Sequence, residues 1–131
     1  MRFALGLTIS CTISAAMITA AGAESRVAAM LRGLDPATRF EQACGIEAMN
    51  RIKKEAAAYR PDRAVTDAVS EAKVKGDTME GAGGAFRSEG KWYQFSFTCK
   101  TSPDRMSVVF FSYKIGSAIP EGKWDSYGLW H

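Results

Sequence analysis

The sequence predicts an α+β domain in which N-terminal helices pack on a curved antiparallel sheet of about four strands, joined by one disulfide. Three observations predict this fold class. Apolar residues recur at helical spacing in the first half, whereas polar and apolar residues alternate in the second half. Two cysteines, Cys44 and Cys99, lie one in each half. We expect a signal peptide over 1–23, an arm or short helix over 24–34, and a single domain over 35–131.

The first 23 residues are typical of a secretory signal peptide. Arg2 precedes an apolar run, and the triplet Ala-Gly-Ala ends at Ala23, which predicts cleavage between Ala23 and Glu24. An uncleaved anchor is the alternative, but a spanning helix needs about 20 apolar residues and this run is shorter. Cys11 lies too early for a lipoprotein signal, because apolar sequence continues after it.

Charge argues against a nucleic-acid partner. Of the 17 basic residues only Arg2 precedes the cleavage site, and all 14 acidic residues follow it, so the mature chain carries a net charge of +2. A balance this even does not predict a strongly anionic partner. No later stretch is apolar enough to span a membrane, so we expect no span after signal cleavage.

The two cysteines that remain after cleavage are predicted to form a disulfide. Exported proteins reach an oxidising compartment, where two thiols normally pair. The bridge would span 55 positions, from Cys44 to Cys99, and stabilise the fold by about 4 kcal/mol. A reactive thiol is the alternative, but the sequence has no C-x-x-C motif and no neighbouring histidine that would lower a thiol pKa.

Helices are expected up to residue 60. Residues 24–34 could form a short helix or an arm. Asp35 followed by Pro36 predicts a helix start, because aspartate caps the free N–H groups and proline already has a helical φ. Gly45 interrupts the apolar stripe, and we expect it to cap a second helix rather than kink one. Pro61 ends the helical region.

Strands are expected after Pro61. The predicted segments are 64–69, 73–80 broken at Gly76-Asp77, 85–87, 91–100 and 106–115, with a turn at the GAGG stretch 81–84. Alternation places Phe97 and Cys99 on one face, and Val109 and Phe111 on one face of the next strand. A three-residue loop at 103–105 would bring these faces together, pairing Cys99 with Val109 and Phe97 with Phe111.

The opposite face of this hairpin is our candidate partner surface. Trp92 and Phe110 are its aromatic members, and Lys100 and Lys114 flank them. Half-covered sheet surface is the commoner explanation of such a pair. The aromatic C-terminus could cover this face or one end of the sheet, with Gly128 closing a helical turn there.

The sequence lacks the residue patterns that most catalytic sites require. The single histidine is His131, the last residue, which argues against histidine-based triads and metal sites. The carboxylates are scattered, and GAGG lacks the Lys-Ser/Thr of a phosphate loop. We therefore predict no catalytic, cofactor or metal residue. A basic cluster, 51–54 with Arg60 and Arg63, is expected to be a solvated helix face, or else a weak contact for anionic envelope polymers or phospholipid heads.

Four stretches together resemble a known family: LDPATRFEQACGIEAMNRI, RPDRAV, AFRSEGKWYQFSFTCKTSPD and YKIGSAIP. They are similar to domain of unknown function 930, a family of small exported or envelope-anchored proteins of Gram-negative bacteria. The resemblance runs from about Leu34 to Trp130, and its most specific parts are the two cysteines and the GKWY strand. Gly45 departs from the polar cap expected there. The resemblance implies a periplasmic location, no activity and no catalytic residue.

The predicted function is that of an exported envelope protein, periplasmic or secreted, which binds a protein or polymer partner without catalysing a reaction. The alternative is a small periplasmic enzyme that uses carboxylates or Tyr/Lys chemistry. A concave pocket with converging carboxylates would favour the enzyme, whereas a flat aromatic patch would favour the binding module.

Overall fold

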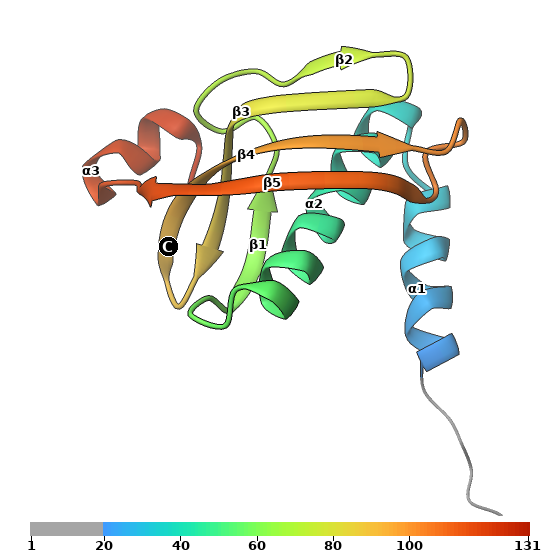
Figure 1. Ribbon diagram of the computed structural model, residues 1–131, viewed down its shortest axis with the longest axis horizontal. Coiled ribbons are helices and arrows are strands. Elements are labelled where there is room, and N and C mark those ends of the chain that lie inside the picture. Colours follow the sequence, from blue (N-terminus) through green and yellow to red (C-terminus); the bar gives the residue numbers. More distant parts are fainter. Residues whose placement is uncertain (1–19) are drawn as a thin grey trace, which may run out of the picture.

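The structure, a computed structural model, describes residues 20–131, with side chains from Arg26 onward. Most of the predicted signal peptide lies outside the described residues, and its cleavage stays a prediction. The elements are α1 (Ala20–Arg32), α2 (Pro36–Glu55), β1 (Pro61–Val65), β2 (Lys73–Lys75), β3 (Thr78–Ser88), β4 (Lys91–Thr101), β5 (Val108–Ala118), α3 (Glu121–Trp124) and a 3-10 turn η1 (Asp125–Tyr127) (Figure 1). This order of helices followed by an antiparallel sheet confirms the predicted α+β class.

Helix α2 begins at the predicted cap but is not divided. The Asp35 side chain accepts hydrogen bonds from the backbone N–H groups of Ala37 and Thr38, at 3.2 and 3.1 Å. The helix then continues through Gly45, so the predicted second helix start is wrong. Gly45 is buried, and a Cβ there would lie 3.5 Å from the carbonyl oxygen of Ala64. Gly45 therefore lies at the contact between α2 and β1 and not at a helix cap.

The sheet has five strands, and its path runs β1-β3-β4-β5. Strand β2 pairs with the first half of β3, and β1 with its second half, so both lie along the same edge of β3. The predicted turn at 81–84 is wrong, because these residues form an irregularity within β3. A Cβ at Gly84 would come within 2.7 Å of the Phe95 ring, and one at Gly81 would clash with Phe97. The glycines thus make room for aromatic rings on the neighbouring strand.

In the β4–β5 hairpin each side chain lies on the predicted face of the sheet, but the connecting loop is longer than predicted. Cys99 lies opposite Phe111, and Phe97 opposite Tyr113, two positions from the predicted register. A shift of two residues keeps every side chain on its face, so the apolar set still points inward. The loop is longer because Asp104 organises it: its carboxylate accepts hydrogen bonds from Ser102 Oγ at 2.6 Å and from the Met106 N–H at 3.1 Å.

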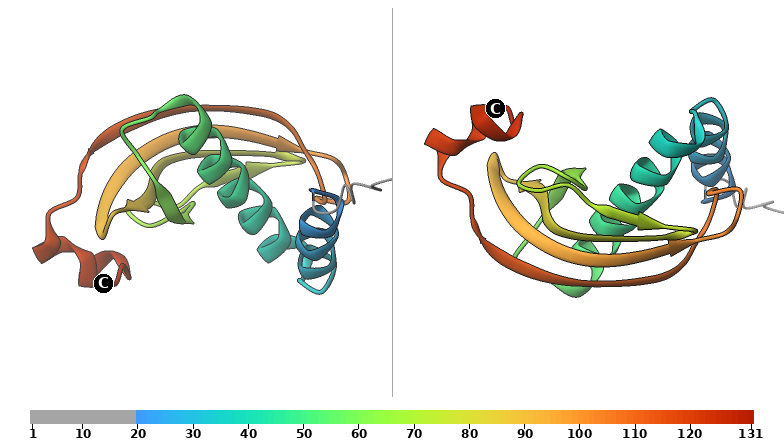
Figure 2. Two further views of the ribbon diagram at one scale, coloured as in Figure 1. Left: turned by 90° about the horizontal axis from the view of Figure 1, so that it is seen from below. Right: turned by 90° about the horizontal axis from the view of Figure 1, so that it is seen from above.

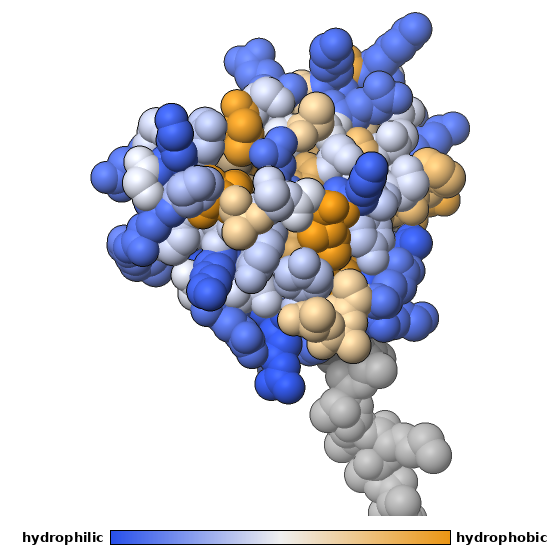
Figure 3. Space-filling model, turned by 60° about the vertical axis from the view of Figure 1, so that its left-hand side comes forward, coloured by the Kyte–Doolittle hydropathy of each residue, from blue (hydrophilic) through white to orange (hydrophobic). Residues whose placement is uncertain are grey.

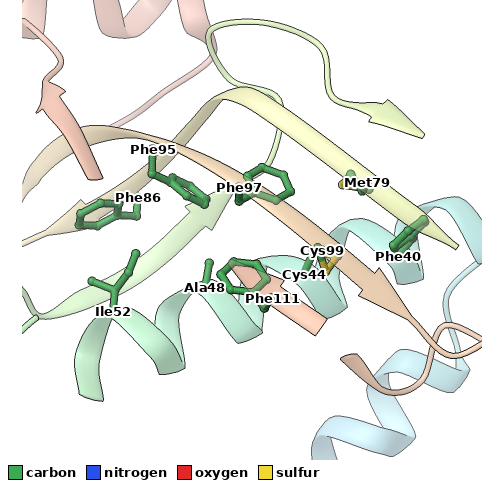
Figure 4. Close-up of a cluster of buried hydrophobic side chains, with 10 residues drawn as sticks. All are labelled: Phe40, Cys44, Ala48, Ile52, Met79, Phe86, Phe95, Phe97, Cys99 and Phe111. Carbon is green, nitrogen blue, oxygen red and sulfur yellow. A yellow bond between two sulfur atoms is a disulfide. The ribbon is translucent and has the colours of Figure 1, made fainter. Parts of the chain in front are cut away.

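The main core lies between α2 and the sheet, which curves around the helix (Figure 2). Ten buried residues form it: Phe40, Cys44, Ala48, Ile52, Met79, Phe86, Phe95, Phe97, Cys99 and Phe111 (Figure 4). The predicted Cys44–Cys99 pair lies at disulfide distance within this core, with its Cα atoms 6.0 Å apart. The bridge therefore joins the middle of α2 to β4.

A second, smaller core gathers under the C-terminal turns. Its buried members are Ala85, Trp92, Ile119, Trp124 and Leu129. The indole N–H of Trp92 donates to the carbonyl oxygen of Trp130 at 2.8 Å, and that of Trp124 donates to Ile119 at 3.0 Å. As predicted, Gly128 closes the last turn, with a φ of 65°. Together these turns hold the C-terminus against the end of the sheet.

Candidate functional site

The surface predicted around Trp92 loses its central residue. Trp92 is fully buried, because the C-terminal turns pack over it, and it cannot contact a partner. Phe110 is 53% exposed and lies opposite Lys100 on the outer face of the sheet. Lys114 is exposed farther along β5. The three side chains that remain, Phe110, Lys100 and Lys114, form only a sparse surface. The prediction that Trp92 binds a partner is therefore wrong, because Trp92 is a packing residue.

Arg51 of the basic cluster takes part in the packing of the fold, and the face drawn in Figure 3 shows no large hydrophobic patch. Arg51 pairs with Glu55 and donates to the carbonyl oxygen of Phe111 at 3.3 Å, so it ties α2 to β5. Hydrogen bonds from Arg51 and Tyr113 lower the pKa of Glu55. On the face drawn in Figure 3, hydrophobic side chains form small groups separated by hydrophilic ones.

A groove runs between α2 and the end of β1. It consists of two adjoining hollows of about 420 and 150 Å³ that share Glu41, Thr66 and Asp67. We call it the α2–β1 groove. The larger hollow extends to Met49 and Trp130, and the smaller one to Val74 and Met79. Its combined size is within the range of small-molecule sites.

Regular elements position the three shared residues. Glu41 lies in the second turn of α2, six residues after the Asp35 cap. Thr66 and Asp67 directly follow β1, whose last residue, Val65, pairs with Ala85 of β3. Thr66 is only 4% exposed. The centre of the groove is therefore built on a helix and a strand end rather than on a long loop.

Trp130 supplies an aromatic wall to the groove. Its side chain is 46% exposed, and its ring lies edge-on to that of Trp92, with centroids 5.2 Å apart. Because Trp92 also binds the Trp130 carbonyl, the buried tryptophan holds the exposed one in place. The sequence did single out the aromatic C-terminus, but it could not tell which of its rings would stay exposed.

The carboxylates of the groove differ in their electrostatic surroundings. Arg87 binds both oxygens of Asp62, at 2.9 and 2.8 Å, and holds its pKa below the usual range. Burial raises the pKa of Glu41, and the charges of Asp67 and Asp35 raise it further. Among the described side chains, neither Glu41 nor Asp67 takes part in an ion pair. The centre of the groove thus carries uncompensated negative charge.

Sequence patterns could not reveal this site, because its residues are far apart along the chain. Glu41 and Asp67 meet only because α2 packs on β1. In the described part of the chain, no three histidine, cysteine, aspartate or glutamate side chains are grouped so that they could hold a metal ion. Within residues 20–131, no helix is both long enough and apolar enough to cross a membrane.

Comparison with protein families gives one match. The model of the Domain of Unknown Function (DUF930) matches residues 31–129, from the end of α1 to the C-terminal turns. The chain belongs to the DUF930 family. The resemblance noted in the sequence is therefore confirmed, and the matched range contains both cysteines and the centre of the groove. Trp130 lies directly after the last matched residue. No curated protein and no solved structure matches the chain.

Proposed function

We propose that this DUF930 protein is an exported binding module of the cell envelope, not an enzyme, whose ligand binds in the α2–β1 groove. One observation carries the proposal: Trp130 is half exposed at the rim of a groove whose centre holds Glu41, Thr66 and Asp67. Small-molecule sites typically combine an aromatic surface with a few polar groups that orient the ligand.

Export is supported by the signal-like N-terminus and by the cysteine pair. Disulfides persist in the periplasm or outside the cell and are rare in the cytosol. Intact-mass measurement of protein recovered from the periplasm should give a chain beginning at Glu24. A full-length chain retained with the inner membrane would refute export by a cleaved signal.

The binding proposal is tested by NMR titration of the full mature chain with mixtures of cationic, anionic and neutral small polar molecules. We expect amide shifts at residues 64–67 and at Trp130. Trp130→Ala should abolish them, whereas Phe110→Ala should not, although both aromatic side chains are about half exposed. If no mixture shifts the groove signals, the site is misplaced.

A carboxylate enzyme is the second candidate, because Glu41 has a raised pKa beside Asp67. Such a pair can divide general acid and base roles. Tyr113 does not favour the tyrosine alternative, since burial and its hydrogen bond to Glu55, at 2.9 Å, raise its pKa. An enzyme would convert a ligand found by titration, and Glu41→Gln would stop conversion while keeping binding. Binding without conversion supports the module.

A further inference from the structure

We infer that the α2–β1 groove binds an organic cation, an ammonium or guanidinium group on an apolar stem, at Glu41, Thr66 and Asp67. The inference rests on the proposed function, because it names the ligand class of the same groove. It follows from three independent properties of the site: its local charge, the hydroxyl group of the buried residue Thr66, and the aromatic wall.

Local charge in the groove is negative although the whole chain carries +3. Glu41, Asp67 and Glu71 line it, and Arg63 is the cationic side chain on its lining. Asp62 contributes little net charge, because Arg87 binds it through two hydrogen bonds. A cation placed between Glu41 and Asp67 would relieve their mutual repulsion, whereas an anion would increase it.

Thr66 offers a hydrogen-bond acceptor at the point where the two hollows join. The residue is 4% exposed and lines both hollows. Among the described side-chain atoms, the one that is fully enclosed without a hydrogen bond is Thr101 Oγ1. The Thr66 hydroxyl is not among such enclosed atoms, although the residue as a whole is buried at the groove. A threonine hydroxyl can accept a hydrogen bond, and an ammonium or guanidinium N–H in the groove would donate one.

The aromatic wall suits a cation on an apolar stem. Trp130 and Met49 line the larger hollow, and the face of an indole ring attracts cations more than other aromatic rings do. The apolar side chains there would cover the methylene groups that carry the charge. A metal ion fits less well, because within the described residues no three suitable side chains are grouped to bind one.

Two sources can supply this chemistry, a free amine or a lysine or arginine side chain of a peptide. Calorimetry on the full mature chain at low salt distinguishes them. The probes are 1,4-diaminobutane, Nα-acetyl-lysine methylamide and Nα-acetyl-arginine methylamide. Controls are the Nε-acetylated lysine derivative, which keeps the stem without the charge, and glutarate. We expect at least one cationic probe to bind at least 10-fold more tightly than either control.

The variants assign the binding to the groove. Glu41→Gln with Asp67→Asn should weaken the cationic probe at least 10-fold, and Thr66→Val should weaken it several-fold. Glu80→Gln, which removes one exposed carboxylate from β3 outside the groove, should have no effect. Binding of the diamine alone identifies a free amine, and binding of the blocked amino acids alone identifies a peptide side chain.

Three results would overturn the inference. If the neutral or anionic control binds as well as the cations, the groove is a ligand site and only its ligand class is wrong. If calcium chloride, added as a further probe, binds in a way that the Glu41→Gln and Asp67→Asn changes abolish while no amine binds, the cation is inorganic. If neither these probes nor the mixed molecules of the NMR titration shift the groove signals, the proposed function fails as well.

Discussion

The indole nitrogen of Trp92 donates a hydrogen bond to the backbone carbonyl of Trp130 across 2.8 Å, so a buried tryptophan fixes an exposed one beside the α2–β1 groove. The two rings also meet edge-on, an arrangement that aromatic pairs prefer. If the groove binds a ligand as proposed, we expect that binding to depend on the packing of the C-terminal turns through this pair.

Replacement of Trp92 tests that link. Trp92→Ala should lower the free energy of unfolding by about 3–5 kcal/mol, because it leaves a large cavity in the second core. Trp92→Phe keeps much of the ring volume and should cost less, since its main loss is the hydrogen bond, about 1 kcal/mol. Urea denaturation measures both. An alanine variant as stable as the wild type would show that Trp92 is not a packing residue.

The cysteine pair should account for a large part of the stability. Replacing Cys44 and Cys99 together by serine should lower the free energy of unfolding by about 2–5 kcal/mol, because the bridge restricts the unfolded chain. Mass spectrometry of unreduced tryptic peptides should find the two cysteines linked. Two free thiols in periplasmic material would contradict both the bridge and the stability expected from it.

The glycines of β3 should resist substitution. Gly84→Ala places a Cβ about 2.7 Å from the Phe95 ring and should destabilise the fold by about 1–3 kcal/mol. Gly81→Ala should behave alike, because Phe97 occupies that space. Gly122→Ala is the matched control: nothing lies within 4 Å of its Cβ, and alanine favours the helical turn. Equal melting temperatures for all three would argue against the aromatic packing described here.

Glu41 should make stability depend on pH in a defined direction. Its pKa is raised in the folded state, mainly by burial, so the folded chain binds its proton more tightly than the unfolded chain. The favourable contribution is complete below the usual glutamate pKa, about 4.3, and is lost as the pH rises through the folded-state pKa. Glu41→Gln should therefore melt higher than the wild type at pH 7, with a difference that shrinks toward pH 4. A glutamine variant that melts at a lower temperature than the wild type at pH 7 would show that ionised Glu41 stabilises the fold, which would refute this account.

Local signals in the sequence predicted the fold because they act over a few residues. Asp35-Pro36 marks a helix start wherever it lies, and the alternation around Phe97 requires one face of a strand to be buried. The same patterns failed at Gly45 and at the GAGG stretch. At these positions the surroundings are set by residues distant in sequence: Gly45 packs beside β1, and Gly81 and Gly84 leave room for two phenylalanine rings of β4.

The site was harder to predict than the fold. Trp92 begins one aromatic stretch and Trp130 ends another, and only the packing of the C-terminal turns decides which of the two is buried. Glu41 and Asp67 belong to different elements, and no spacing rule links them. Glu41 and Asp67 come together because α2 packs closely on β1, and the sequence does not reveal this packing.

The central claim is that the α2–β1 groove is the ligand site and that Trp130 forms its wall. The most direct test follows the three tryptophan indole signals by NMR during titration with the tightest-binding cationic probe. We predict that the Trp130 indole signal and the amide signals of residues 64–67 shift together along one saturable curve. The amide signals of Phe110 and Lys114, on the outer face, should not shift. Shifts confined to Phe110 and Lys114, with the Trp130 signal unchanged, would contradict the account.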